Sequence, residues 1–192
     1  SLNFIKAGAV MDINYIDNTL TMRSDFDATD DLHAIPFSPS SSCAGVSGLL
    51  GCGLGPIVCV PTLVTQDDRT YPANAFVDTG SPMSMVLRSR IEANGMQTIN
   101  VEECNLMDVV IPVEIDDQKI IYKNRPNLGL KFLSEQGSVE SGISGMLIAC
   151  GKNDALPSHV YNDKLALVDL SPYVDATAGN DALYRHGRVV FD

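Results

Sequence analysis

The chain of 192 residues is 45% hydrophobic, which is enough for one globular domain with a substantial core and too much for a wholly disordered chain. Its 13 basic and 24 acidic residues give a net charge of −11, which argues against nucleic acid or an anionic membrane as a partner. No apolar run approaches the roughly 20 residues that span a bilayer, and the first residues do not read as a signal peptide. We therefore expect a globular domain that binds neither nucleic acid nor membrane.

The five cysteines are an odd number and include no Cys-x-x-Cys pair. They are Cys43, Cys52, Cys59, Cys104 and Cys150. A disulfide framework would leave one thiol over, so we expect reduced, mostly buried thiols and favour an intracellular or virion-associated setting over a secreted one. The histidines, His33, His159 and His186, are scattered singly, whereas zinc needs ligands paired at short spacing. We therefore expect no metal and no cofactor.

The first 43 residues divide into a β pattern and a polar stretch. Residues 4–22 show apolar alternation on both sides of an Ile-Asp-Asn turn, which predicts a half-buried hairpin. Residues 24–43 are acidic and rich in Ser and Pro, without periodicity, and are typical of a flexible linker. We therefore divide the chain into a hairpin and linker over 1–43 and a main domain over 44–192.

The main domain carries β patterns with little helix. Residues 57–64 and 71–77 flank a polar Gln-Asp-Asp-Arg turn and predict a hairpin whose second strand ends at Asp78. Further strands are predicted around 99–101, 109–115, 120–122, 128–133, 165–170 and 188–191, with a polar loop between the last two. Residues 84–96 predict a short helix closed by Gly95 in the C′ position. The expected class is all-β with one or two short helices.

The turn Asp78-Thr79-Gly80-Ser81 is the strongest candidate for chemistry. Burial disfavours an ionised carboxylate, so an Asp at the end of an apolar strand needs hydrogen-bond partners or a function. The Thr79 and Ser81 hydroxyls and the backbone N–H groups of the turn can supply those partners. Gly80 permits unusual backbone angles and close approach of another segment. The same four residues also form ordinary surface turns, but the apolar segments on both sides favour a buried loop.

The stretch Phe-Val-Asp-Thr-Gly-Ser-x-x-Ser followed by two apolar residues, over 76–86, resembles the active-site loop of aspartic proteases. The predicted helix and Gly95 that follow are similar to the retropepsin-like branch of retroelements, not to pepsin-type lobes. The resemblance covers about 57–96 closely and residues up to about 160 more loosely. It implies a retropepsin-like closed β-sheet or barrel domain.

The resemblance also implies a reaction and a partner. Aspartic proteolysis needs two carboxylates that share one proton, and this chain has one Asp-Thr-Gly. The expected enzyme is therefore a homodimer in which two copies of Asp78 meet and cleave extended polypeptides, as in the processing of a polyprotein. The resemblance assigns Thr79 to a hydroxyl lattice that braces the two loops, Ser81 to a hydrogen bond with the outer carboxylate oxygen, and Gly80 to close approach of the loops.

Three further segments match the family less closely. A hairpin over 109–123 is expected to cover the substrate as a flap, with Ile115, Asp116, Asp117 and Gln118 at its tip, although 97–112 is an alternative. Residues 145–156 resemble the family's two apolar residues, Gly and short helix, with Ile143-Ser144-Gly145 as the other counterpart. Residues 4–22 resemble the family's closing strands. Either they are the end of a preceding domain, or the similarity is one that hairpins share in general.

Two other classes of function stay open. One is a catalytically inactive protease-like domain that serves in binding or assembly. The other is a viral structural β-domain in which the turn is fortuitous. The intact Asp-Thr-Gly-Ser favours the enzyme, because a binding module has no need of a buried acid at that place.

Overall fold

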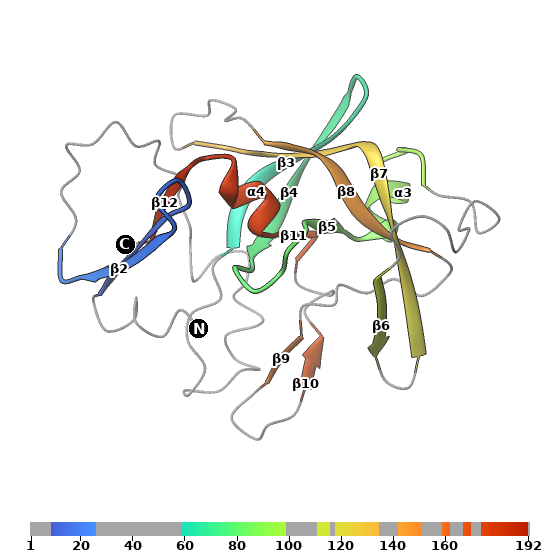
Figure 1. Cartoon of the computed structure of the whole chain (residues 1–192). Helices are drawn as coiled ribbons and strands as arrows, with labels where there is room; N and C mark the ends of the chain where they lie inside the picture. Colours follow the sequence, from blue (N-terminus) through green and yellow to red (C-terminus); the bar gives the residue numbers. More distant parts are fainter. Residues whose placement is uncertain are drawn as a thin grey trace.

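The computed structural model describes residues 9–25, 59–98, 111–115, 118–134, 142–150, 159–161, 167–169 and 174–191. Most of these residues belong to β-strands, and six of the strands close into a barrel (Figure 1). Around the barrel they are β3 (Cys59–Gln66), β4 (Arg69–Val77), β11 (Ala176–Ala178), β5 (Met85–Val86), β8 (Ile143–Cys150) and β7 (Gln118–Phe132), and β7 pairs again with β3. The prediction of an all-β fold with short helices is confirmed.

The barrel interior is filled by alternate residues of its strands. In β4 the buried residues are Tyr71, Ala73, Ala75 and Val77, every second position, as the two-residue period of a strand dictates. Their side chains join one core cluster with buried residues of β3, β7, β8 and β11. Since the last inward residue of β4 is Val77, the strand ends in the core and the next residue, Asp78, begins the turn.

Helix α3 (Arg88–Ala93) follows β5 and ends in the way the sequence predicts. Gly95 has φ +66°, its N–H donates to Glu92 O, and the Met96 N–H donates to Ile91 O. These two bonds close the helix end, so the predicted C′ role of Gly95 is confirmed. The predicted start at residue 84 is wrong, because Met85–Val86 forms β5 between β11 and β8.

A second, three-stranded sheet has the order β12-β1-β2 and lies beside the barrel (Figure 1). Strands β1 (Val10–Asn14) and β2 (Thr19–Arg23) form the predicted hairpin, and β12 (Arg188–Phe191) pairs with β1. Met11, Ile13 and Tyr15 pack against the core cluster of the barrel. The hairpin predicted ahead of the main domain therefore shares its core.

The segment between the two predicted closing strands is not a polar loop. Strand β10 (Leu167–Asp169) pairs with β9 (His159–Tyr161), and β12 is where the last strand was predicted. Between them lie β11 and a second short helix, α4 (Asn180–Tyr184). The sequence prediction missed β11 because three small residues give too short a pattern to identify a strand. It missed α4 because five residues are too few to show a helical period. The strand predicted at 99–101 lies outside the described residues.

The expectation of reduced thiols is wrong for the two cysteines that the structure describes. Cys59, at the start of β3, and Cys150, at the end of β8, each take part in a disulfide bond. Cys43, Cys52 and Cys104 lie outside the described residues. An odd cysteine count carries no information on which thiols meet in space, and disulfides persist mainly in oxidising surroundings. The thiol argument for an intracellular setting therefore no longer holds.

A buried carboxylate joins all three strands of the hairpin sheet. Asp12 of β1 is 4% exposed and accepts from Arg188 Nε at 3.0 Å and Arg188 Nη2 at 2.9 Å. Its Oδ2 also lies 2.8 Å from Arg23 Nη2 of β2. The hydrogen bonds from Arg188 lower the pKa of Asp12 against the opposing effect of burial. Because the pKa of Asp12 is lower in the folded state, its ionised carboxylate stabilises the fold at pH values above the unfolded-state pKa of about 3.9. This stabilisation is lost as the pH falls through the folded-state pKa.

We predict that Asp12→Asn lowers the free energy of unfolding by about 2 kcal/mol at neutral pH, between the values for surface and fully buried ion pairs. The difference from wild type should start to shrink as the pH falls below about 4, and it should vanish once the pH has passed through the lowered folded-state pKa of Asp12, because the wild-type carboxyl is then protonated too. Urea unfolding at both pH values measures this, with the exposed Asp25→Asn as control. An equal loss at both pH values would contradict the ionic role.

Candidate active site

Asp78 begins a tight turn that is attached to β11. Its N–H donates to Ala178 O at 3.0 Å, which continues the parallel pairing of β4 with β11. The Ser81 N–H donates back to Asp78 O at 3.1 Å and closes the turn. The backbone on which the carboxylate stands is therefore fixed by the barrel on one side and by its own turn on the other.

The Asp78 carboxylate is half-buried and accepts a hydrogen bond from the Gly80 N–H at 2.9 Å to Oδ1. A Cβ at Gly80 would lie 3.2 Å from that same oxygen, closer than side chains normally pack. Gly80 is not among the described glycines with positive φ. The glycine is therefore explained by close approach to the carboxylate, and the expected unusual backbone angle is not its reason.

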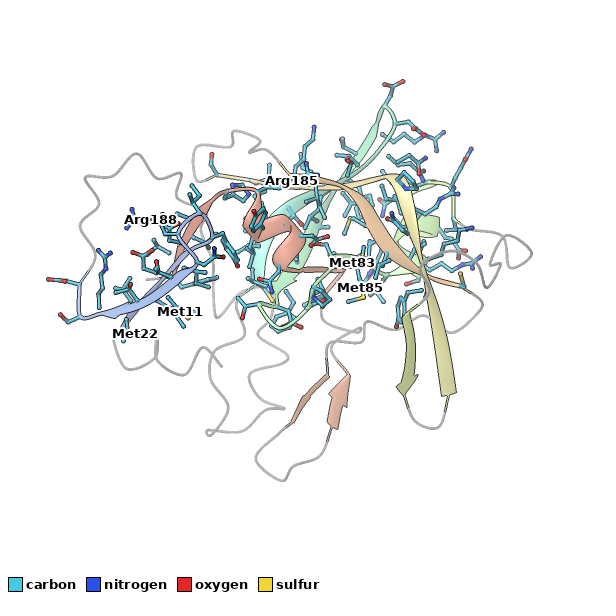
Figure 2. The ribbon with its side chains drawn as sticks, in the orientation of Figure 1. Met11, Met22, Met83, Met85, Arg185 and Arg188 are labelled. Atoms are coloured by element: carbon cyan, nitrogen blue, oxygen red, sulfur yellow. The ribbon has the colours of Figure 1, made fainter. Side chains whose placement is uncertain are left out.

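Ser81 is buried, but its hydroxyl does not donate to the carboxylate as the resemblance implies. Ser81 Oγ donates to Met83 O at 2.8 Å, two residues on. A Ser hydroxyl has one proton, and a backbone carbonyl two residues away competes for it locally. In this chain Ser81 therefore stabilises the far side of the turn, and Figure 2 shows the segment that follows, with Met83 and Met85 labelled.

The turn packs against Gly179 and the first residue of α4. A Cβ at Gly179 would lie 2.6 Å from the Met83 carbonyl carbon and 3.0 Å from Ser81 O, so only glycine fits. The Asn180 N–H donates to Ser81 O at 2.8 Å, and Asn180 Nδ2 donates to Thr79 O at 2.6 Å. Strand β11, Gly179 and α4 thus hold the backbone of the Asp78 turn on its inner side.

A second contact fastens α4 to the end of the turn. Ser84 is fully buried, its Oγ donates to Asp181 Oδ1 at 2.7 Å, and its N–H donates to Asp181 Oδ2 at 3.0 Å. Ser84 Oγ also accepts from the Gly179 N–H at 3.0 Å. The Asp181 carboxylate therefore receives two hydrogen bonds from one residue, and the Ser that ends the motif is fixed by them.

The two apolar residues, Gly and short helix of the family were expected at 145–156, with Ile143-Ser144-Gly145 as the other counterpart. Residues 145–150 of this range belong to β8, a barrel strand whose Leu147 N–H donates to Ser84 O, and residues 151–156 lie outside the described ones. The unit that holds the Asp78 turn is at 176–184. Sequence reasoning missed Gly179, Asn180 and Asp181, although the signal was present, since Ala178-Gly179 ahead of Asn-Asp repeats the apolar–Gly–helix pattern.

The predicted flap is a hairpin, as expected. Strand β6 (Ile111–Ile115) pairs with β7 from Ile115 opposite Gln118, and the arm projects from the barrel (Figure 1). Asp116 and Asp117, the predicted tip, lie outside the described residues, as does most of the alternative flap at 97–112. That the arm covers a substrate stays a prediction.

The residues that the structure describes contain neither a metal-binding cluster nor a membrane-spanning helix. No group of three or more His, Cys, Asp or Glu side chains there could hold a metal ion. No described helix has the length and apolar character to cross a membrane.

Comparison with known proteins adds no family. No protein-family model, no curated protein and no solved structure matches this chain.

We predict that Ser84→Ala lowers the free energy of unfolding by about 2 kcal/mol, because it leaves the buried Gly179 N–H without an acceptor and removes the hydroxyl hydrogen bond to Asp181 Oδ1. Ser24→Ala, at an exposed position beyond β2, should change it by less than about 0.5 kcal/mol. Denaturant unfolding followed by circular dichroism measures both. Equal stabilities of the two variants would mean that the Ser84–Asp181 contact does not hold the turn.

Proposed function

We propose that this protein is an aspartic-type endopeptidase whose active site contains two copies of Asp78, one from each subunit of a homodimer. The observation that carries the proposal is the way Asp78 is held. A half-buried carboxylate stands at the end of a core strand, accepts the Gly80 N–H, and sits on a turn fixed by Ala178, Gly179 and Asn180. A surface turn has no need of such fixation, whereas a catalytic carboxylate must be held in place.

The reaction would be hydrolysis of a peptide bond by activated water. The ionised carboxylate takes a proton from water as the oxygen attacks the carbonyl carbon, and the protonated carboxylate donates to the carbonyl oxygen. The tetrahedral intermediate then breaks its C–N bond, and the leaving nitrogen takes up a proton. Two carboxylates in different protonation states are required, so a single chain supplies half of the site and Asp78 of the partner subunit supplies the rest.

An exposed apolar face supports a second copy as partner. Among the described residues the large exposed hydrophobic side chains are Ile16, Leu20, Met22 and Tyr184. Leu20 of β2 lies opposite Ile13 of β1, and Met22 lies opposite Met11. The side chains of these two pairs therefore lie on one face of the hairpin sheet, which we call the hairpin face. Figure 2 shows Met11 and Met22 there together. This hairpin face is packed on the core along β1 and open along β2, which is the kind of surface that a partner covers.

The substrate class follows from the same proposal. The β6–β7 hairpin would lie over an extended polypeptide as a flap, so that the scissile bond is held between it and the paired carboxylates. Such a substrate fits a role in processing a polyprotein. The alternative is an inactive protease-like domain for binding or assembly. One observation favours it: the Ser81 hydroxyl donates to Met83 O and not to the Asp78 carboxylate.

We predict that Asp78→Asn lowers peptide cleavage by about 10⁴-fold or more, because the amide can neither ionise nor take a proton from water. The measurement is cleavage of a mixed peptide library from about pH 4 to 7, with an active-site inhibitor of aspartic proteases as a second control. Cleavage that survives the substitution would disprove the assignment. A verified wild-type dimer that cleaves nothing at any pH would favour the binding domain.

We also predict that Leu20→Lys weakens the homodimer by about tenfold or more, because it places a charge on the hairpin face that the second copy would bury. Thr21→Lys is the matched control, since its neighbouring position on the same exposed strand points to the opposite face. Sedimentation velocity over a concentration series measures both dissociation constants. Equal effects of the two substitutions would exclude the hairpin face as the dimer contact.

A further inference from the structure

A chain of two hydrogen bonds joins the hairpin to the Asp78 turn. Tyr15 OH lies 2.9 Å from Asn180 Oδ1, and Asn180 Nδ2 lies 2.6 Å from Thr79 O. Helix α4, which begins with Asn180, lies between the hairpin and the barrel strands in Figure 1. Tyr15 and Thr79 are far apart in the sequence, so the fold alone places them at the two ends of one side-chain amide.

The direction of these bonds follows from chemistry. Thr79 O is a backbone carbonyl and can only accept, so the Asn180 amide must turn its NH₂ group toward it. The amide oxygen then faces Tyr15, which obliges the phenol to donate. Burial raises the pKa of Tyr15 above its ordinary value of 10.0, so the hydroxyl keeps its proton over the pH range in which an aspartic protease works.

Tyr15 is itself held by the C-terminal part of the fold. Its N–H donates to Gly187 O at 2.7 Å, and its ring contacts the edge of Tyr184 with centroids 5.7 Å apart at 70°. The phenol is therefore anchored at its backbone and its ring before the hydroxyl reaches Asn180. A group anchored in this way can fix the position of the amide that it contacts.

We propose that the N-terminal hairpin is part of the catalytic apparatus, and that Tyr15 acts through Asn180 as a positioning residue for the Asp78 turn. This inference rests on the proposed protease function. Asn180 contacts the carbonyls on both sides of Gly80, one from its side chain and one from its backbone, and the Gly80 N–H contacts the Asp78 carboxylate. A small displacement of a reacting group costs a large factor in rate, about 10²-fold for 1 Å, while substrate contacts elsewhere are unchanged.

The first test is Tyr15→Phe, which removes the hydroxyl and keeps the ring contact with Tyr184. We expect kcat to fall about tenfold with KM within about twofold of wild type, because the turn is displaced and the remaining substrate contacts are kept. Tyr71→Phe is the matched control. It removes a buried hydroxyl in the core, at the start of β4 and about 20 Å along the strand from Asp78, so kcat should not change.

A second variant separates positioning from stability. Asn180→Ala should lower kcat at least as much as Tyr15→Phe, and the double variant should be no slower than Asn180→Ala alone, because the hydroxyl acts only through the amide. Thermal unfolding of each variant gives its folded fraction. An unchanged kcat in Tyr15→Phe, or a double variant whose losses multiply, would overturn the inference.

The Gly80 and Ser81 amide resonances, measured by NMR in wild type and Tyr15→Phe, separate this inference from the proposed function. We expect both resonances to shift and Gly80 hydrogen exchange to accelerate in Tyr15→Phe, with no such change in Tyr71→Phe. If the wild type cleaves nothing and the shifts are seen, the protease proposal fails and the link from Tyr15 to the turn stands. If the wild type cleaves and neither kcat nor the resonances change, the link itself is wrong.

Discussion

The parallel pairing of β11 with β4 is the constraint on which the rest of the structure depends. Residues 176–178 lie beside 75–77, so a strand of three residues both completes the barrel and ends next to Asp78. Its last carbonyl, on Ala178, accepts the Asp78 N–H and thereby fixes where β4 stops. Without that acceptor the turn would have a buried N–H with no partner, which costs about 1–3 kcal/mol.

Small side chains make this pairing possible. Ala75, Ala176 and Ala178 are fully buried. The carbonyl groups of Ser81 and Met83 lie so close to Gly179 that a Cβ atom there would collide with them. Close packing of backbone on backbone leaves little room for adjustment. The chain then enters α4 at once, so Asn180 and Asp181 meet the turn while their positions are still set by β11. Rigidity at the turn is therefore a consequence of small residues in β11 as much as of the hydrogen bonds.

What the sequence could predict was local, and what it could not predict was long-range. An apolar strand that ends in Asp-Thr-Gly-Ser, the hairpins on either side and the Gly95 helix end each lie within a few neighbouring residues, and the structure has them there. The placement of β11 depends on a partner strand about a hundred residues away, and the cysteine spacing did not reveal that Cys59 and Cys150 take part in disulfide bonds. The Ser81 proton was misassigned because two acceptors compete for it, and a motif does not decide between them.

The hairpin sheet supports the helix that contacts the Asp78 turn. Strand β12 follows α4 after three residues and pairs with β1. The hairpin sheet therefore holds α4, the helix that contacts the Asp78 turn. Asp12 fastens that sheet by accepting from Arg188 of β12 and pairing with Arg23 of β2. Acid weakens this fastening, since it depends on an ionised carboxylate. The proposed protease chemistry would need one protonated carboxylate and would work toward acid pH, whereas the lowered pKa of Asp12 keeps the sheet fastened until the pH falls below the ordinary range of an aspartate.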